Sequence, residues 1–158
     1  MMLLFVIRYN NINSKYPSPV VIVQNEEGIV RLGSYEVKLL EFSITSFEKL
    51  TVDYPSSSYF EQQIETNEEV LLFTISFTNI DGDENPMAIY NTTVSTGYTT
   101  NGMDLFAFYD INDCDPVLLL EKNQSVELTL PYTLFNEDIS GDLELLFALY
   151  PEIIKLII

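Results

Sequence analysis

The sequence predicts an all-β domain built as an antiparallel sandwich. The strongest support is the segment EVLLFTISFTN at 69–79, where large apolar residues alternate with mostly polar ones, the period of a half-buried strand. Short apolar runs recur along the rest of the chain, separated by segments rich in Gly, Asn, Asp and Pro. Many short strands at roughly even spacing are typical of a sandwich.

The strands can be assigned in order along the chain. They are predicted at 28–32, 35–47, 69–79, 87–94, 104–109, 116–120, 125–134, 142–150 and 153–158. In the second of these the alternation slips between Leu40 and Phe42, which indicates a bulge or bend. The last segment, IIKLII, is expected to be the final strand of the sandwich, with pairing to another chain as the alternative, because an exposed apolar edge promotes aggregation.

Helix signals are few. The best candidate is 56–69, where Ser58 can act as an N-cap and Glu61 completes a capping box three residues later. At most one short helical turn is therefore predicted, near residues 56–66. No internal repeat and no Gly/Ser-rich linker marks a second domain.

The N-terminus begins with seven apolar residues, MMLLFVI, followed by a polar stretch that contains Pro17 and Pro19. Seven residues of helix span about 10 Å, too little for a hydrocarbon core of about 30 Å. The preferred interpretation of 1–19 is the end of a membrane anchor or signal segment plus an extended spacer, with 20–158 as the sandwich domain. An ordinary first strand and a short interfacial anchor are the alternatives.

The net charge of −17 is concentrated in one part of the sequence. Residues 1–50 carry five cations and five anions, whereas residues 51–158 carry two lysines against 19 Asp and Glu. Such a surface repels phosphate backbones, so nucleic-acid binding is not expected. Solubility is the simplest role for this charge, with a cation or a basic partner as the alternatives. The single cysteine, Cys114, excludes an intrachain disulfide.

Three segments in this order resemble a known set of domains. They are EVLLFTISFTN ending at Asn79, LFAFYD ending at Asp110, and LLLEKNQSVELTLPYTL at 118–134. Together they resemble the immunoglobulin-like extracytoplasmic domains of unknown function found on Gram-positive secreted, lipoprotein or single-span proteins, which are related in fold to a mycobacterial secreted immunoprotective antigen. The resemblance spans about residues 28–150, and it implies an immunoglobulin-like antiparallel β-sandwich on a secreted or membrane-tethered protein with no assigned activity.

Catalysis is not expected, and no catalytic residue is proposed. The chain has no His, so it lacks the usual general base and the commonest transition-metal ligand. Cys114 lies between Asp113 and Asp115, whose charges raise the pKa of a thiol and make it a poor nucleophile. With 24 Asp and Glu, some pair always has a separation suited to glycoside hydrolysis, so that pattern carries little information.

Binding of a divalent cation is a sharper hypothesis. Asp81, Asp83 and Asn85 present alternating oxygen side chains, as a Ca²⁺-wrapping loop does, although Pro86 and Thr92 stand where an EF-hand needs Gly and a bidentate Glu. With two further acidic loops, the candidate ligands are Asp81, Asp83, Asn85, Asp110, Asp113 and Asp138. Strict alternation of strand direction would place all three loops at one negative end of the sandwich. The alternative is that these residues form ordinary solvated turns.

The predicted function is that of a non-catalytic extracytoplasmic binding or accessory domain, membrane-anchored or secreted. The expected partner is another protein or a cell-envelope component, and contact with the membrane is expected only through the N-terminal anchor. No cofactor is expected. The alternative function is an acidic structural domain that binds Ca²⁺, and a carboxylate hydrolase is a distant third.

Overall fold

The structure is a computed structural model that describes residues 20–24, 29–66, 68–82, 86–96, 99–134, 143–149 and 152–157. These residues form a mixed α/β fold. The prediction of an all-β immunoglobulin-like sandwich with at most one short helical turn near 56–66 is therefore wrong. The elements are, in order, β1 (Val20–Gln24), β2 (Ile29–Leu32), β3 (Tyr35–Ser46), α2 (Phe47–Asp53), α3 (Ser58–Gln63), the 3-10 turn η1 (Ile64–Thr66), β4 (Glu69–Asn79), β5 (Met87–Ala88), the 3-10 turn η2 (Ile89–Asn91), β6 (Thr92–Ser95), β7 (Thr100–Gly102), α4 (Leu105–Asn112), β8 (Val117–Leu118), β9 (Ser125–Leu134), β10 (Glu144–Leu149) and β11 (Glu152–Ile157).

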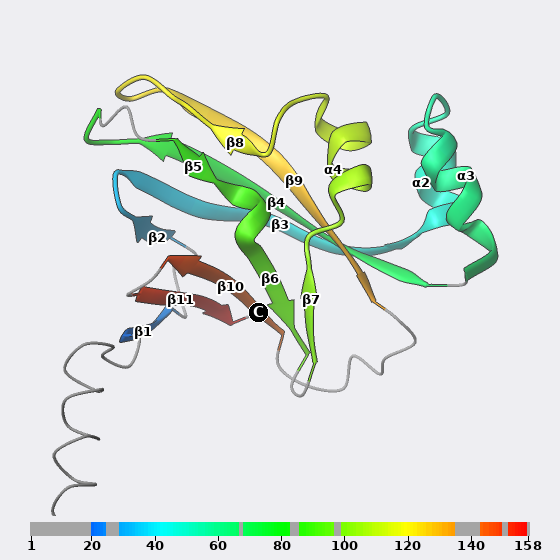
Figure 1. Cartoon of the computed structure of the whole chain (residues 1–158), viewed down its shortest axis with the longest axis horizontal. Helices are drawn as coiled ribbons and strands as arrows, with labels where there is room; N and C mark the ends of the chain where they lie inside the picture. The colour runs from blue at the N-terminus through cyan, green and yellow to red at the C-terminus, as the bar shows by residue number, and fades with distance from the viewer. Residues whose placement is uncertain are drawn as a thin grey trace, which may run out of the picture.

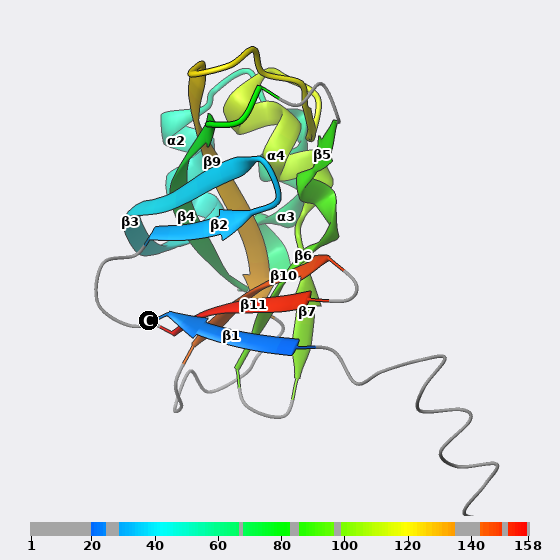
Figure 2. The same cartoon turned by 90° about the vertical axis from the view of Figure 1, so that its left-hand side faces the viewer.

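The strands form two larger sheets and a short ribbon (Figure 1). One sheet has the order β1-β11-β10-β6-β7, the other has the order β2-β3-β4-β9, and β5 pairs with β8. Neighbouring strands are antiparallel except β1 and β11, which are parallel. Figure 2 shows β1, β11 and β10 side by side below β2 and β3.

The main core lies between the two larger sheets. Along β4, the side chains of Leu71, Phe73, Ile75 and Phe77 are fully buried and point into this core, as their alternation predicts. The facing sheet contributes Val94, Leu145 and Phe147 to the same cluster of buried residues. The bulge expected in 35–47 is confirmed, since the register of β3 against β4 shifts between Leu39 and Glu41.

A second, smaller core forms where α2 and α3 meet the start of β4. The N-cap of α2 is Ser46, whose side chain accepts a hydrogen bond from the Lys49 N–H. The N-cap of α3 is Ser57, one residue before the expected cap. The buried residues of this second core are Phe47, Leu50, Phe60, Val70 and Ala107.

The helix α4 lies along the free edge of β9, which is the last strand of its sheet. The Asp104 N–H donates to the Pro131 carbonyl at 2.9 Å. The Asn112 side chain donates to the Thr129 carbonyl and accepts from the Thr129 N–H, each at 2.8 Å. These bonds satisfy backbone groups that an uncovered edge strand leaves open to another chain. These contacts with the edge of β9 fix the position of α4. The side chains of Ala107 and Phe108, on the inner side of this helix, are fully buried.

The segment 104–109 is the main source of the error in fold class. It was assigned as a strand because it is a short apolar run, and such runs fit a buried strand and a buried helix equally well. The decisive signal is Asp104, an N-cap whose carboxylate accepts a hydrogen bond from the Ala107 N–H at 3.1 Å. The end of the predicted strand 35–47 and the predicted strand 87–94 also differ, since Phe47 begins α2 and η2 interrupts 87–94.

The strand β11 lies between β1 and β10, inside its sheet. The assignment of IIKLII as a strand is thereby confirmed, and this segment is not an open edge. The strand β1, which is not among the predicted strands, pairs with β11 on its outer side. The segment 1–19 lies outside the described residues. Within the described residues, none of the helices is long and apolar enough to cross a bilayer.

Candidate functional site

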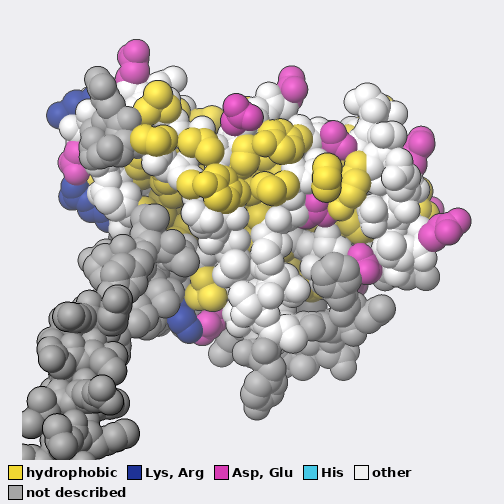
Figure 3. Space-filling model, viewed as in Figure 1, with side chains coloured by type: hydrophobic (Ala, Val, Ile, Leu, Met, Phe, Trp, Pro, Cys, Tyr) yellow, Lys and Arg dark blue, Asp and Glu magenta, His cyan; other side chains and the backbone are white. Residues whose placement is uncertain are grey.

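Six large apolar side chains on η2, on α4 and in the segment around β8 are exposed, and we refer to them as the apolar face. Figure 3 shows hydrophobic side chains gathered in a band over β5, β8 and α4. Phe106 is 70% exposed and Leu119 is 66% exposed, and the other members are between 41% and 46% exposed. The apolar face consists of Tyr90, Leu105, Phe106, Tyr109, Val117 and Leu119.

The local structure explains why these residues point outward. On α4, Leu105 and Tyr109 are four residues apart and share one side of the helix with Phe106, because helical neighbours recur at three to four residues. The opposite side of α4 is buried against the sheets. In β8, the extended backbone turns Leu118 into the core and exposes Val117 and Leu119 on either side.

The apolar face is large for a surface patch. Aromatic side chains offer about 150–250 Å² each when fully exposed, so six partly exposed apolar residues present on the order of 500 Å². That is the size of the largest patch on a typical monomer, which is often a binding site. At one end the face meets an open cavity of about 560 Å³ lined by Gly82, Leu119, Leu120, Glu121, Lys122 and Gln124.

Exposed carboxylates border the apolar face, and we call them the carboxylate rim. Asp110 follows Phe106 by one helical turn, and Asp113 follows Tyr109 by the same interval. Asp115 and Glu121 lie two residues before Val117 and two after Leu119. Figure 3 shows acidic side chains along the upper side of the apolar band and near its right-hand end. The rim consists of Asp110, Asp113, Asp115 and Glu121, with Lys122 as a neighbouring cation at the cavity end.

The rim carboxylates are mostly available for contact. The ion pairs within the described part of the chain join Arg31 to Asp81 and Lys155 to Glu144, neither of which involves the rim. One oxygen of Asp110 accepts a hydrogen bond from the Ser57 hydroxyl, which ties α4 to α3. Within the described structure, the rim carboxylates are therefore not neutralised by ion pairs.

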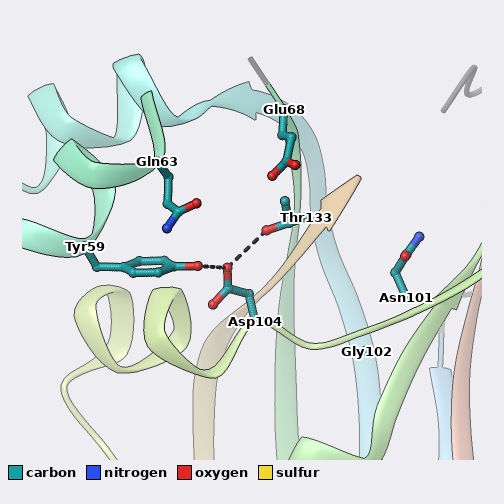
Figure 4. Close-up of a pocket in the computed structure, with 7 residues that line it drawn as sticks. All are labelled: Tyr59, Gln63, Glu68, Asn101, Gly102, Asp104 and Thr133. Atoms are coloured by element: carbon teal, nitrogen blue, oxygen red, sulfur yellow. Dashed lines mark hydrogen bonds between the residues drawn. The ribbon is translucent and has the colours of Figure 1, made fainter. Parts of the chain in front are cut away.

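A small polar pocket lies at the start of α4 (Figure 4). Its centre is Asp104, whose carboxylate accepts hydrogen bonds from Tyr59 at 2.6 Å and from Thr133 at 3.0 Å. Burial, and then the hydrogen bond to Asp104, raise the pKa of the Tyr59 phenol. The pocket measures about 210 Å³, below the range of roughly 300–1,000 Å³ typical of small-molecule sites. We interpret the role of these hydrogen bonds as structural, because they connect α3 and β9 to the N-cap of α4.

The three candidate cation ligands that the structure describes do not lie together. Asp81 follows β4 and forms an ion pair with Arg31. Asp110 and Asp113 belong to α4 and its C-cap, and Asp113 has a left-handed backbone with φ of 50°. Asp83, Asn85 and Asp138 lie outside the described residues. Among the residues that are described, no three His, Cys, Asp or Glu side chains form a group that could hold a metal ion.

The expectation of one negative end for all three acidic loops is wrong. Asp81 lies just beyond Asn79, at the end of β4 that pairs with the start of β3. Asp110 is bonded to Ser57, at the start of α3, which follows the opposite end of β3. The count of alternating strands failed because 105–112 is a helix along the sheet edge. The third loop, 136–142, lies outside the described residues.

Cys114 is partly buried against the main core. Burial, and then the carboxylates of Asp115 and Asp113, raise the pKa of its thiol. The expected direction of this shift is confirmed. The thiol is therefore protonated at neutral pH and poorly nucleophilic.

The comparisons with known proteins show a likeness in fold. The sequence matches no protein-family model, and no curated protein matches it. The fold is similar to the crystal structure of a "putative lipoprotein (ycdA)" from Bacillus subtilis, with a TM-score of 0.55 and 16% identity over 84% of this chain. It is also similar to a functionally unknown protein from Listeria monocytogenes, with a TM-score of 0.53 and 10% identity over 75% of this chain.

These two likenesses differ in how much of the other protein they cover. The chain spans 38% of the length of the Bacillus protein and 67% of the Listeria protein. The expected resemblance to Gram-positive proteins of unknown function is thus confirmed at the level of the fold, whereas the all-β immunoglobulin-like description is not.

Proposed function

We propose that this chain is a non-catalytic extracytoplasmic domain, secreted or membrane-anchored, that binds another protein or a cell-envelope component through the apolar face. The observation that carries the proposal is the exposure of Phe106, Tyr109 and Leu119, together with the band of hydrophobic side chains over β5, β8 and α4 in Figure 3. The largest apolar patch on a monomer is often a binding site.

The rigid support of the apolar face favours binding over simple exposure. α4 is fixed by hydrogen bonds from Asp104 and Asn112 to the edge of β9, so its outer side chains are presented in one arrangement. A preorganised surface loses less conformational entropy when a partner docks. The extracytoplasmic location is supported by the likeness in fold to the Bacillus protein and by the apolar segment at 1–7.

The proposal can be tested in cells of a Gram-positive bacterium. The photoreactive residue p-benzoylphenylalanine would replace Phe106 on the apolar face or, as a matched control, Val52, which is 76% exposed on α2. Irradiation should form discrete cross-links from position 106 and not from position 52. Protease added to intact cells should digest the domain, since an extracytoplasmic domain is accessible. Protection from protease, or equal cross-linking from both positions, would contradict the proposal.

A further inference from the structure

We propose that the partner of the apolar face is a cationic, apolar segment of another protein, in which large apolar side chains are flanked by Lys or Arg. This inference rests on the proposed function and adds the chemistry of the partner. It follows from the arrangement of the apolar face and the carboxylate rim on the same surface.

The apolar face specifies the centre of the partner segment. Phe106 and Leu119 are the most exposed members, and the ring of Phe106 packs against that of Tyr59, with 5.4 Å between the ring centroids. Interfaces place large apolar and aromatic anchors at their centre and polar groups at their margin. The partner should therefore present leucine, phenylalanine or similar side chains to this surface.

The carboxylate rim specifies the margin of the partner segment. Asp113 and Asp115 are exposed and lie at the end of α4, beside the exposed residues of α4 and β8. Opposite charges across an interface raise the association rate and exclude partners of the wrong sign. Four rim carboxylates against Lys122 leave the margin strongly negative. Lys or Arg side chains beside the apolar anchors of the partner would form ion pairs with the carboxylate rim.

The same charges disfavour the other occupants of an apolar surface. Two copies of this chain, each with net charge −17, would bring one carboxylate rim against another. An anionic bilayer attracts basic rather than acidic surfaces. A segment of a basic protein fits the charge of this surface.

The test uses a synthetic peptide in which pairs of leucine and phenylalanine alternate with pairs of lysine, titrated into the full chain by calorimetry. Phe106→Ser should weaken binding about tenfold or more, as the loss of a central anchor does, whereas Val52→Ser should leave it unchanged. Asp113→Asn with Asp115→Asn should weaken binding about threefold to tenfold and reduce its salt dependence. Asn is chosen because it tolerates the left-handed backbone at position 113.

The matched charge control is Glu36→Gln with Glu41→Gln, which removes two exposed carboxylates from β3 and should have a smaller effect. Melting curves of every variant confirm folding. Equal binding of a peptide with glutamate in place of lysine would overturn the inference. So would Phe106-dependent binding to phosphatidylglycerol vesicles, or equal losses in the rim and control variants.

The two proposals fail in different ways. Cross-links from position 106 to a partner that lacks a basic segment would overturn this inference and leave the proposed function standing. Absence of cross-links from position 106, together with selective binding of the lysine peptide, would overturn the proposed function and leave the chemical preference of the surface intact.

Discussion

At the scale of single residues, polar side chains that are buried or partly buried position the elements around the candidate site. Asn112 bonds both backbone groups of Thr129, and the fully buried Asn79 donates to the Leu120 carbonyl and accepts from the Gly82 N–H. The Asn112 amide takes the place of a strand neighbour along β9, whereas the Asn79 amide joins the turn after β4 to the segment before β9. Residues of this kind are hard to assign from sequence, because an Asn at the end of an apolar run is equally compatible with a solvated turn.

Asn112→Ala should reduce the free energy of unfolding by about 1–3 kcal/mol, because it leaves the Thr129 N–H and carbonyl without their side-chain partner. Urea unfolding followed by circular dichroism would measure the change. The exposed Asn91 provides a control, since Asn91→Ala should stay within about 0.5 kcal/mol of the parent chain. Equal effects of the two substitutions would mean that Asn112 does not anchor α4.

The burial of Tyr132 should make the stability of the fold depend on pH in the alkaline range. Complete burial raises the pKa of its phenol, whose neutral hydroxyl is hydrogen-bonded to Thr92. In the unfolded chain a tyrosine loses its proton near pH 10. The folded state then binds more protons than the unfolded state, so stability is complete below about pH 10 and falls as pH rises above it.

Tyr132→Phe should therefore flatten the loss of stability above about pH 10, although it removes the bond to Thr92 at neutral pH. Urea unfolding at a series of pH values would compare its slope with that of the parent chain. A control is Tyr90→Phe, because Tyr90 is largely exposed. If the slopes of the Tyr132→Phe variant and the parent chain were the same, Tyr132 would not be the source of the pH dependence.

At the scale of elements, the structure depends on a helix that covers a strand edge. The predicted strands 69–79 and 125–134 have the bounds observed for β4 and β9. Apolar and polar residues alternate over ten or more positions only in a strand. α4 was not predicted, since its eight residues are too few to show a clear helical period, and its position depends on contacts with β9, which begins 13 residues beyond its end. Without α4 as a helix, the apolar face could not be seen, because Leu105, Phe106 and Tyr109 do not share one side of a strand.

Phe108→Ala should loosen α4 and expose the edge of β9, which favours pairing between chains. Phe147→Ala is the matched control, since Phe147 is also buried but lies on β10, in the other large sheet. Both should lose about 3–5 kcal/mol of stability. Size-exclusion chromatography at matched folded fraction should show concentration-dependent oligomers for Phe108→Ala alone. Oligomers from both variants, or from neither, would contradict the edge-covering role.

At the scale of the whole molecule, the fold determines where the negative charge and the exposed apolar side chains lie. The net charge was available from the sequence, but its division between a carboxylate rim and an apolar surface required the fold. The acidic loops of Asp81 and Asp110 lie at different places because the chain turns into α4 instead of crossing the sheet again. The partner class follows from this arrangement, since the surface joins apolar anchors to a negative margin.

The excess of carboxylates also predicts a salt effect on stability. Seven cations face 24 Asp and Glu, so repulsion among carboxylates opposes the compact state, and salt screens it. Raising NaCl from about 0.02 M to about 0.5 M should raise the melting temperature by a few degrees. Scanning calorimetry would show this shift. A lower melting temperature at high salt would mean that favourable ion pairs outweigh the repulsion.

The most direct test of the apolar face as the binding surface is hydrogen exchange by mass spectrometry, with and without the lysine peptide. Binding should slow exchange in 103–120, which contains α4 and β8, and leave the turn between β2 and β3 unchanged. Phe106→Ser should abolish this protection. Protection centred on β3 or on the loop after Asn79, with 103–120 unaffected, would contradict the assignment of the apolar face.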